Sequence, residues 1–310
     1  MAAIAFAAAA GVAVGAMLLG DRGGDGERPR GVPPFVLDLG VRTDPEAQEL
    51  RRAAQAYRGG DRPRAGRILS DRRSLQAEVG KALSTWPDGS LARLEELASA
   101  HPRSGAVLFH LGLARFWDGD SDGALAAWRL TRQQDPDTAY AVRASDLVFR
   151  AFPPGRPTFV PSFRTDSEVV GLPPSRQLAA LARKARRDDV RAKLLYGIAL
   201  QRLERPVSAQ EQFAAAARLA PTSPETLVAD AVGRFDKAQP NQAFSRLGPL
   251  TRRFPKAATV RFHLGLMLLW LSQLEEARRQ LRLAAGLGGS PLAREAKRLL
   301  TRLEDVRPPE

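Results

Sequence analysis

The sequence predicts an all-α protein made of repeated helical hairpins. A pentapeptide, Phe-His-Leu-Gly-Leu, occupies residues 109–113 and returns at residues 262–266. The segment 105–138 and three later segments also share one spacing of small and large residues over 34 positions, and all but the last carry proline at position 32, where the last has Gly289. A pattern that recurs at a constant period is typical of stacked repeats, in which each hairpin buries its apolar face against the next.

The chain begins with an uncharged stretch, residues 2–20. As a helix it would be about 28 Å long, close to the ~30 Å hydrocarbon core of a bilayer. We therefore expect residues 1–20 to form a transmembrane helix that anchors the protein in a cell membrane by a single pass. The alternative is a signal peptide, residues 1–16, whose removal would leave a secreted protein. Residues 21–44, rich in Gly, Pro and mixed charges, predict a flexible linker and leave the side of the membrane open.

Folded structure is expected to begin at Asp44-Pro45. Aspartate caps helix N-termini, and proline fits the first helical position because its missing N–H is not needed there. Residues 46–57 then carry a helical pattern, and Gly59 is a typical stop signal.

Two interpretations fit the next stretch, residues 62–86. Its apolar residues form one helical stripe, which is consistent with a single long helix. Alternatively, Ser70-Asp71 caps a new helix, and a degenerate repeat spans residues 71–104. The second interpretation meets the repeat at residue 105 without a gap, so we expect N-terminal repeats over residues 45–138.

Three contiguous repeats are expected over residues 190–291, because the pattern recurs there every 34 residues without an insertion; they begin at Val190, Pro224 and Ala258. The last residues, 292–310, carry one apolar stripe and a charged tail. A capping helix is expected here, since stacked repeats need a cover for their last exposed face.

The interval between the two groups of repeats, residues 139–189, is 51 residues long, which equals one repeat of 34 plus 17. We expect a single repeat with helices at 139–152 and 175–189 and an insertion at the turn between them. The insertion, residues 153–174, contains six prolines, which exclude helix and favour extended chain. Its large apolar residues are expected to lie against the helices rather than in solvent; they are Phe159, Val160 and Phe163.

Three positions of the repeat predict how its helices pack. A small residue at position 8 lets the helix axes approach to ~8–10 Å. A large residue at position 24 fills the space beside it, and proline at position 32 ends the second helix. Position 8 is Gly112, Gly197, Ala231 and Gly265, position 24 is Trp128, Phe213, Leu247 and Leu281, and position 32 is Pro136, Pro221 and Pro255.

This spacing resembles the tetratricopeptide repeat (TPR) superfamily, and together with the uncharged N-terminus it indicates a membrane-anchored member of bacterial type. The resemblance implies a right-handed α-solenoid. It also implies a non-enzymatic scaffold that holds another protein's peptide or helix in a concave groove lined by the first helix of each repeat. By repeat position, the lining residues would be Phe109, Leu113, Phe116, Trp117, Leu194, Ile198, Gln201, Val228, Val232, Phe235, Phe262 and Leu266.

Other chemistry-bearing residues fit a structural role. Residues 118–123 read Asp-x-Asp-x-Asp-Gly, the opening of a calcium loop, but Arg129 stands where that loop needs a bidentate glutamate, so we expect a plain turn. His110 and His263 share position 6 of their repeats, which repeat geometry explains; the alternative is that they form hydrogen bonds in the groove. With no cysteine and no catalytic motif, the sequence predicts a protein that is not an enzyme and holds no cofactor or metal.

Two further hypotheses concern the surface and the insertion. The net charge of +13 makes binding of nucleic acid or another polyanion through an arginine-rich surface the main alternative function. The charge is not gathered into one block, which favours the simpler interpretation of solvated helix faces. In the other hypothesis, residues 159–163 fill the groove until a partner displaces them, so that the scaffold is autoinhibited.

Overall fold

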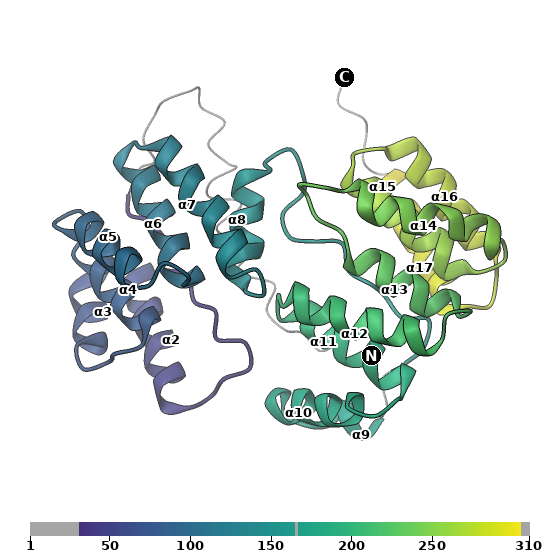
Figure 1. Ribbon diagram of the computed structural model, residues 1–310, viewed down its shortest axis with the longest axis horizontal. Helices are drawn as coiled ribbons and strands as arrows, with labels where there is room; N and C mark the ends of the chain where they lie inside the picture. Colours follow the sequence, from purple (N-terminus) through teal and green to yellow (C-terminus); the bar gives the residue numbers. More distant parts are fainter. Residues whose placement is uncertain (1–30, 165–166, 305–310) are drawn as a thin grey trace. The chain divides into compact units, whose positions relative to one another are not determined.

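The computed structural model describes residues 31–164 and 167–304, and all regular secondary structure in these ranges is helical (Figure 1). Sixteen helices, α2–α17, are present in this part of the chain, and it contains no strand. The predicted all-α class is therefore confirmed. The predicted anchor or signal segment, residues 1–20, lies outside the described residues. Among the helices that are described, none combines the length and the apolar character needed to cross a bilayer.

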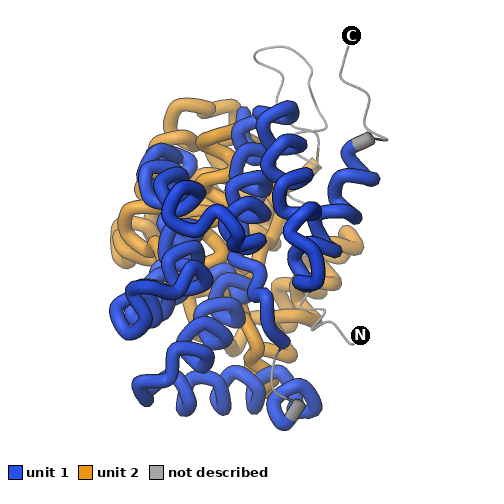
Figure 2. The backbone as a smooth tube through the Cα atoms, turned by 90° about the vertical axis from the view of Figure 1, so that its right-hand side faces the viewer, with its two compact units in different colours: residues 1–4, 151–310 blue, residues 5–150 orange. Residues whose placement is uncertain are grey.

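The described chain forms two compact units, which are coloured separately in Figure 2. Unit 2 contains the described residues up to 150, and unit 1 contains those from 151 onward. Within each unit, helices that follow one another in sequence pack together, and successive hairpins contact each other. Each hairpin therefore buries its apolar face against its neighbour, as stacked repeats require.

Unit 2 is made of three hairpins and a last helix. The hairpins are α2 (Pro45–Arg58) with α3 (Arg62–Leu69), α4 (Leu75–Ser84) with α5 (Ser90–Ala100), and α6 (Gly105–Asp118) with α7 (Ser121–Gln134), and α8 (Ala139–Val148) closes the unit.

The predicted start of unit 2 is confirmed, because the Asp44 side chain accepts a hydrogen bond from the backbone N–H of Ala47. The stretch 62–86 contains two helices rather than one, which confirms the repeat interpretation. The cap of the second helix is Ser74, however, and not Ser70-Asp71. Ser70 and its neighbours belong to the turn between α3 and α4.

Unit 1 begins with the short helix α9 (Ser167–Val170) and with α10 (Pro174–Ala185). Three hairpins follow: α11 (Val190–Arg202) with α12 (Pro206–Leu219), α13 (Pro224–Gly233) with α14 (Asn241–Arg253), and α15 (Ala258–Trp270) with α16 (Leu274–Gly286). The predicted repeat starts at residues 190, 224 and 258 are confirmed to the residue. α17 (Pro291–Glu304) packs against α15 and α16, which confirms the predicted C-terminal helix.

The middle of the chain differs from the expectation in detail. α8 ends at Val148 instead of residue 152, and α10 ends at Ala185 instead of residue 189. The insertion, expected to exclude helix, contains the short helix α9, because no proline lies between residues 162 and 172. The two helices belong to different compact units. Their pairing as one repeat across an enlarged turn stays a prediction.

The small-against-large packing is confirmed at three of the four hairpins. A methyl group on Gly112 would lie 2.4 Å from the indole nitrogen of Trp128, and one on Gly197 would lie 2.4 Å from the Phe213 ring. Both distances are far below van der Waals contact. The third glycine of this set, Gly265, approaches Leu281 in the same way, at 2.8 Å. Glycine at position 8 is therefore required by the bulk at position 24.

The acidic stretch at residues 118–123 is a turn between α6 and α7. Gly119 has a φ of 98°, a left-handed conformation that glycine adopts without strain. Asp120 caps α7 by accepting a hydrogen bond from the N–H of Gly123 at 2.8 Å. The predicted turn is confirmed.

Candidate functional site

Two non-helical segments lie against the helices, one in each unit. The N-terminal strap, residues 32–39, buries Phe35, Val36 and Leu39 in unit 2. The central strap, residues 156–163, buries Phe159 in unit 1, where the side chain is 2% exposed. Neither strap contains a helix.

The N-terminal strap corrects the predicted linker, residues 21–44. From residue 32 onward this stretch is packed rather than flexible, because Phe35 and Leu39 belong to the apolar core of α2–α6. The Gly, Pro and charge content that predicted a linker is concentrated before residue 32. The central strap confirms the expectation that the apolar residues of the insertion lie on the helices.

The two straps share a short sequence pattern. Residues 33–39 read Pro-Pro-Phe-Val-Leu-Asp-Leu, and residues 157–163 read Pro-Thr-Phe-Val-Pro-Ser-Phe. When the two stretches are aligned, the first proline, the Phe-Val pair and the final apolar residue fall at the same positions. Each unit therefore carries the same kind of segment at its N-terminal end, ahead of its hairpins.

Each strap is attached to a histidine on the third hairpin of its unit. In unit 2, the backbone N–H of Val36 donates to Nε2 of His110 on α6 at 3.0 Å. In unit 1, the backbone N–H of Val160 donates to Nε2 of His263 on α15 at 2.9 Å. The Phe-Val pair and the Phe-His-Leu-Gly-Leu pentapeptide thus meet in the same way twice.

The tautomer of both histidines follows from their other ring nitrogen. Nδ1 of His110 lies 2.6 Å from the carbonyl oxygen of Ala106, and Nδ1 of His263 lies 2.7 Å from that of Thr259. A carbonyl can only accept, so Nδ1 carries the hydrogen and Nε2 is the acceptor for the strap. Burial lowers the pKa of each imidazole to about 4, which keeps both neutral at pH 7.

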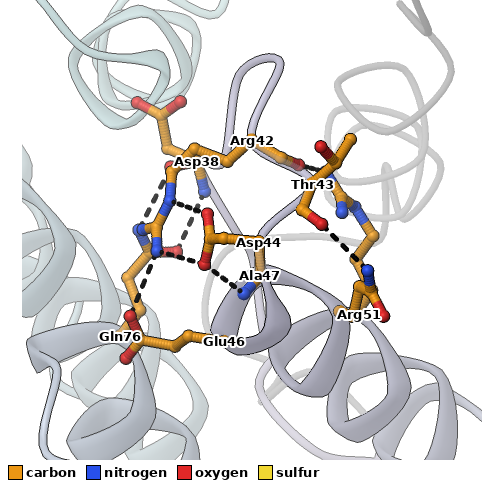
Figure 3. A network of polar contacts seen from close by, with 9 residues as sticks. Asp38, Arg42, Thr43, Asp44, Glu46, Ala47, Arg51 and Gln76 are labelled. Carbon is orange, nitrogen blue, oxygen red and sulfur yellow. Dashed lines mark hydrogen bonds and ion pairs between the residues drawn. The ribbon is translucent and has the colours of Figure 1, made fainter.

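A second attachment comes from the second residue of α4 and of α13. In unit 2, Gln76 pairs with the backbone of Asp38, accepting from its N–H at 3.3 Å and donating to its carbonyl at 3.1 Å (Figure 3). In unit 1, Glu225 accepts from the N–H of Ser162 at 2.7 Å and from its hydroxyl at 3.0 Å. Asp38 and Ser162 both stand two positions after the valine of their strap.

The N-terminal strap is also held by α2 and α8. The buried hydroxyl of Tyr57 donates to the carbonyl of Pro33 at 2.7 Å, and burial raises the pKa of this tyrosine. Asp38 accepts from the first N–H of α8, that of Ala139, at 3.0 Å. The hydroxyl of Tyr140 accepts from the N–H of Asp38 at 3.1 Å. This strap therefore caps the N-terminus of α8 in addition to filling part of the apolar core.

The chain that joins this strap to α2 carries an exposed ionic cluster, also visible in Figure 3. The guanidinium of Arg42 donates to Asp44 at 2.8 Å and to Glu46 at 3.1 Å. The hydrogen bonds from Arg42 and from the N–H of Ala47 lower the pKa of Asp44 to about 2. The cluster orders the entry to α2 at the solvent-exposed surface, where ion pairs contribute little stability.

The central strap is held by α11 and by aromatic contacts. Gln201 accepts the N–H of Phe159 at 3.1 Å. The Phe159 ring stacks on His263 with centroids 5.1 Å apart, and meets Phe213 edge-on at 5.7 Å. Arg156 at the start of the strap donates to the carbonyl of Phe235. The first helix of each unit 1 hairpin therefore contributes one hydrogen bond or more to this strap.

Glu225 is unusual because its carboxylate is partly buried and contacts only neutral groups. Burial raises its pKa, and the hydrogen bonds from Ser162 and Thr259 oppose that rise only in part. Among the described residues, no cation lies within ion-pair distance of Glu225. The neighbouring carboxylate on the same helix, Asp230, pairs with Arg234 at 3.1 Å and with Arg246 at 3.6 Å.

The predicted groove residues lie mostly in the cores that meet the straps. In unit 2 they share an apolar cluster with Val36; they are Phe109, Leu113, Trp117 and the partly buried Phe116. In unit 1, one group shares a cluster with Phe159, namely Leu194, Ile198, Val228, Val232 and Phe235. Phe262 and Leu266 share another with Val160, and Gln201 bonds the strap directly. Their role in binding a partner stays a prediction.

Apart from Gln201, the residues that form the polar contacts were not among the predicted lining residues; they are Tyr57, Gln76, His110, Tyr140, Glu225 and His263. One signal for them exists in the sequence. The two histidines occupy the same repeat position inside an identical pentapeptide, and a polar residue repeated at a buried position needs a buried partner. The identity of that partner required the fold.

No family model matches the chain, and no curated protein matches it. Among solved structures it is similar to yeast Tom70, with 13% identity over 84% of this chain and 53% of that one, at a TM-score of 0.29. It is also similar to a chain of the APC/C hetero-tetramer Cut9-Hcn1, with 16% identity over 77% of this chain and 46% of that one, at 0.31. The chain spans about half the length of either.

Proposed function

We propose that this protein is a non-enzymatic interaction scaffold whose hairpins present a receptor face for a non-helical peptide segment of another protein. The observation that carries the proposal is that each unit already holds such a segment of its own chain. In both units the first helices of the hairpins supply side-chain acceptors for backbone N–H groups of a strap.

The geometry favours a peptide in open conformation over a helix as the bound partner. His263, Gln201 and Glu225 all accept hydrogen bonds from backbone N–H groups of the strap. In a helix, nearly all N–H groups are already bonded to carbonyls four residues earlier. Only a segment without helix has free N–H groups to offer, as in other modes of peptide recognition that use main-chain hydrogen bonds.

A substitution that removes one of these acceptors tests the proposal. Proteins captured by the full chain are identified, purified and titrated calorimetrically against wild type, Gln201→Ala and the control Gln239→Ala. Gln201 binds the strap, whereas Gln239 is an exposed glutamine in the turn before α14. We expect weaker binding only for Gln201→Ala. Equal affinity of every captured protein for all three chains would contradict the proposal.

We further propose that residues 2–20 tether this scaffold to a cell membrane. The support is the uncharged run of a length that matches a bilayer. A cell fraction washed with alkaline carbonate should retain the full chain in the membrane pellet and release a chain that lacks residues 2–20. N-terminal sequencing that finds the mature protein starting near residue 17 would replace the anchor with a cleaved signal peptide.

A further inference from the structure

The contrast between Gln76 and Glu225 points to the chemistry of the partner. At the same place in the two units, the strap residue two positions after valine meets an amide in unit 2 and a carboxylate in unit 1. The amide both donates to and accepts from the strap backbone, which satisfies it. The carboxylate can only accept, and the central strap offers it a neutral hydroxyl and one N–H.

We propose that the receptor face of unit 1 binds a partner segment of the form Phe-Val-x-Lys or Phe-Val-x-Arg in place of the central strap, with the cation paired to Glu225. This inference rests on the proposed function and names the class of its partner. In this role, residues 156–163 are a resident substitute that occupies the face until the partner displaces them.

The Phe-Val pair is required by two contacts that both straps make. The phenylalanine ring packs beside the histidine, with centroids 5.1 Å apart in unit 1 and 6.0 Å apart in unit 2. The N–H of the following valine donates to Nε2 of that histidine in both units. Because two separate straps agree on these positions, the face itself selects the pair, and a competing segment must reproduce it.

The cation follows from the state of Glu225. A partly buried carboxylate gains a Coulombic attraction from a cation that a neutral donor cannot supply, and this attraction is larger at a partly buried site than in water. Ser162, which faces this carboxylate, brings no charge. A lysine or arginine in its place would form an ion pair in a partly buried site, so the incoming segment would bind more tightly than the strap contact that it replaces.

Unit 2 has no carboxylate that would select a cation at this strap position, so it serves as a comparison within the same chain. Gln76 carries no charge, and the strap residue opposite it is Asp38, whose carboxylate is already used by the first N–H of α8. A cation at that strap position would find an amide instead of a carboxylate. The exchangeable strap is therefore the central one.

Labelled peptides can test both parts of the recognition. The reference peptide has the sequence of residues 156–164, and three relatives carry Ser162→Arg, Phe159→Ala, or N-methyl valine at position 160. Binding is followed by fluorescence anisotropy to the full chain with Phe159→Ala, in which the resident strap is weakened. We expect the Ser162→Arg peptide to bind about fivefold more tightly than the reference peptide. The other two should not bind, because one lacks the ring and the other lacks the N–H for His263.

Substitutions in the receptor identify the cause of the fivefold difference. When Glu225→Gln is added to the same chain, the reference peptide and the Ser162→Arg peptide should bind with equal affinity. The control substitution Gln239→Ala should preserve the fivefold difference between them. A difference that survives Glu225→Gln, or an N-methyl peptide that binds as well as the reference, overturns the proposal.

If the Phe159→Ala chain does not fold, hydrogen exchange of the wild-type chain replaces it. Saturating Ser162→Arg peptide should then speed exchange in residues 156–163 and leave residues 32–39 unchanged; no change in the central strap overturns the proposal. Dimers formed by exchange of the central strap between two copies would also overturn it. Should no peptide bind while a purified partner remains sensitive to Gln201→Ala, this inference fails and the proposed function stands.

Discussion

The two straps solve the same packing problem with different consequences. Both place a phenylalanine beside a buried histidine and donate the next N–H to it. The N-terminal strap, however, is also bonded by Tyr57 and supplies Asp38 to the start of α8. The central strap ends instead on Glu225, a carboxylate with only neutral partners.

We take this difference to separate a structural strap from the strap that we propose to be exchangeable. Removing the N-terminal strap would expose Phe35 and Leu39 of the core and leave the first N–H of α8 without its acceptor. Removing the central strap would free a carboxylate and a histidine acceptor that a peptide can satisfy. Under the proposed function, similar contacts serve stability in unit 2 and recognition in unit 1, and four predictions test that distinction.

Acidification is expected to have the largest effect. The pKa values of His110 and His263 fall from 6.5 to about 4 on folding, so the unfolded chain takes up protons first as the pH drops. Their stabilising effect is complete above pH 6.5 and is lost progressively down to pH 4. Relative to pH 7, each histidine should lower the free energy of unfolding by about 2 kcal/mol at pH 5 and by about 3 kcal/mol at pH 4. The added hydrogen would lie on Nε2 and face the strap N–H.

The two units should respond unequally to acid. The raised pKa of Glu225 acts in the opposite direction, because the folded state binds that proton more readily and gains stability as the pH falls through it. Unit 1 should therefore lose less than unit 2. Hydrogen exchange of residues 32–39 and 156–163, corrected for intrinsic rates, gives the comparison at pH 7 and 5. An NMR titration in which either buried histidine protonates near pH 6.5 in the folded protein would refute it.

Adding one methyl group at position 8 should destabilise both units equally. Gly112→Ala and Gly197→Ala each place a carbon 2.4 Å from a large ring, and we expect a loss of about 2 kcal/mol from overpacking. Gly286→Ala, at the last position of α16, is the control, because nothing lies within 4 Å of its added carbon. It should change the free energy of unfolding by less than about 0.5 kcal/mol. Urea titrations measure all three, and a wild-type midpoint for Gly197→Ala would contradict the packing.

Exchanging the two residues at the second helix position sharpens the comparison further. Gln76→Glu removes the donor to the Asp38 carbonyl and adds a negative charge beside Asp38, so unit 2 should lose about 1 to 2 kcal/mol. Glu225→Gln keeps an acceptor for Ser162 and removes a desolvated charge, so unit 1 should change by less than about 0.5 kcal/mol. Exchange rates of the two straps report both effects. Equal losses of stability for the two substitutions would mean that positions 76 and 225 play the same role, which contradicts the distinction between the straps.

The smallest effect is expected at Tyr57. Tyr57→Phe removes only the hydroxyl that donates to the Pro33 carbonyl, which should cost about 1 kcal/mol in unit 2. Arg202 stands at the corresponding helix position in unit 1, so that unit should be unaffected. Faster exchange limited to residues 32–39 would support the assignment, whereas faster exchange in both straps would show that Tyr57 acts on the whole chain.

Some elements follow from local periodicity and could be predicted. Hairpin starts at 190, 224 and 258 follow from the spacing of apolar and small residues, and glycine at 112 and 197 follows from the ring at position 24. Capping is local as well, so the start at Asp44 was predictable. Ser74 was missed as a cap because Ser70-Asp71, four residues earlier, has the same capping chemistry.

By itself, then, the sequence determined the helices, their register and the residues that let them approach, because each depends on neighbours within one hairpin. The tertiary structure alone decided where the straps lie and what the histidines do. The bond from Val36 to His110 spans 74 residues, and the bond from Val160 to His263 spans 103. No short-range pattern specifies such a pair. The buried histidine acceptor exists only after the hairpins have stacked, and a backbone N–H of the strap then donates to it.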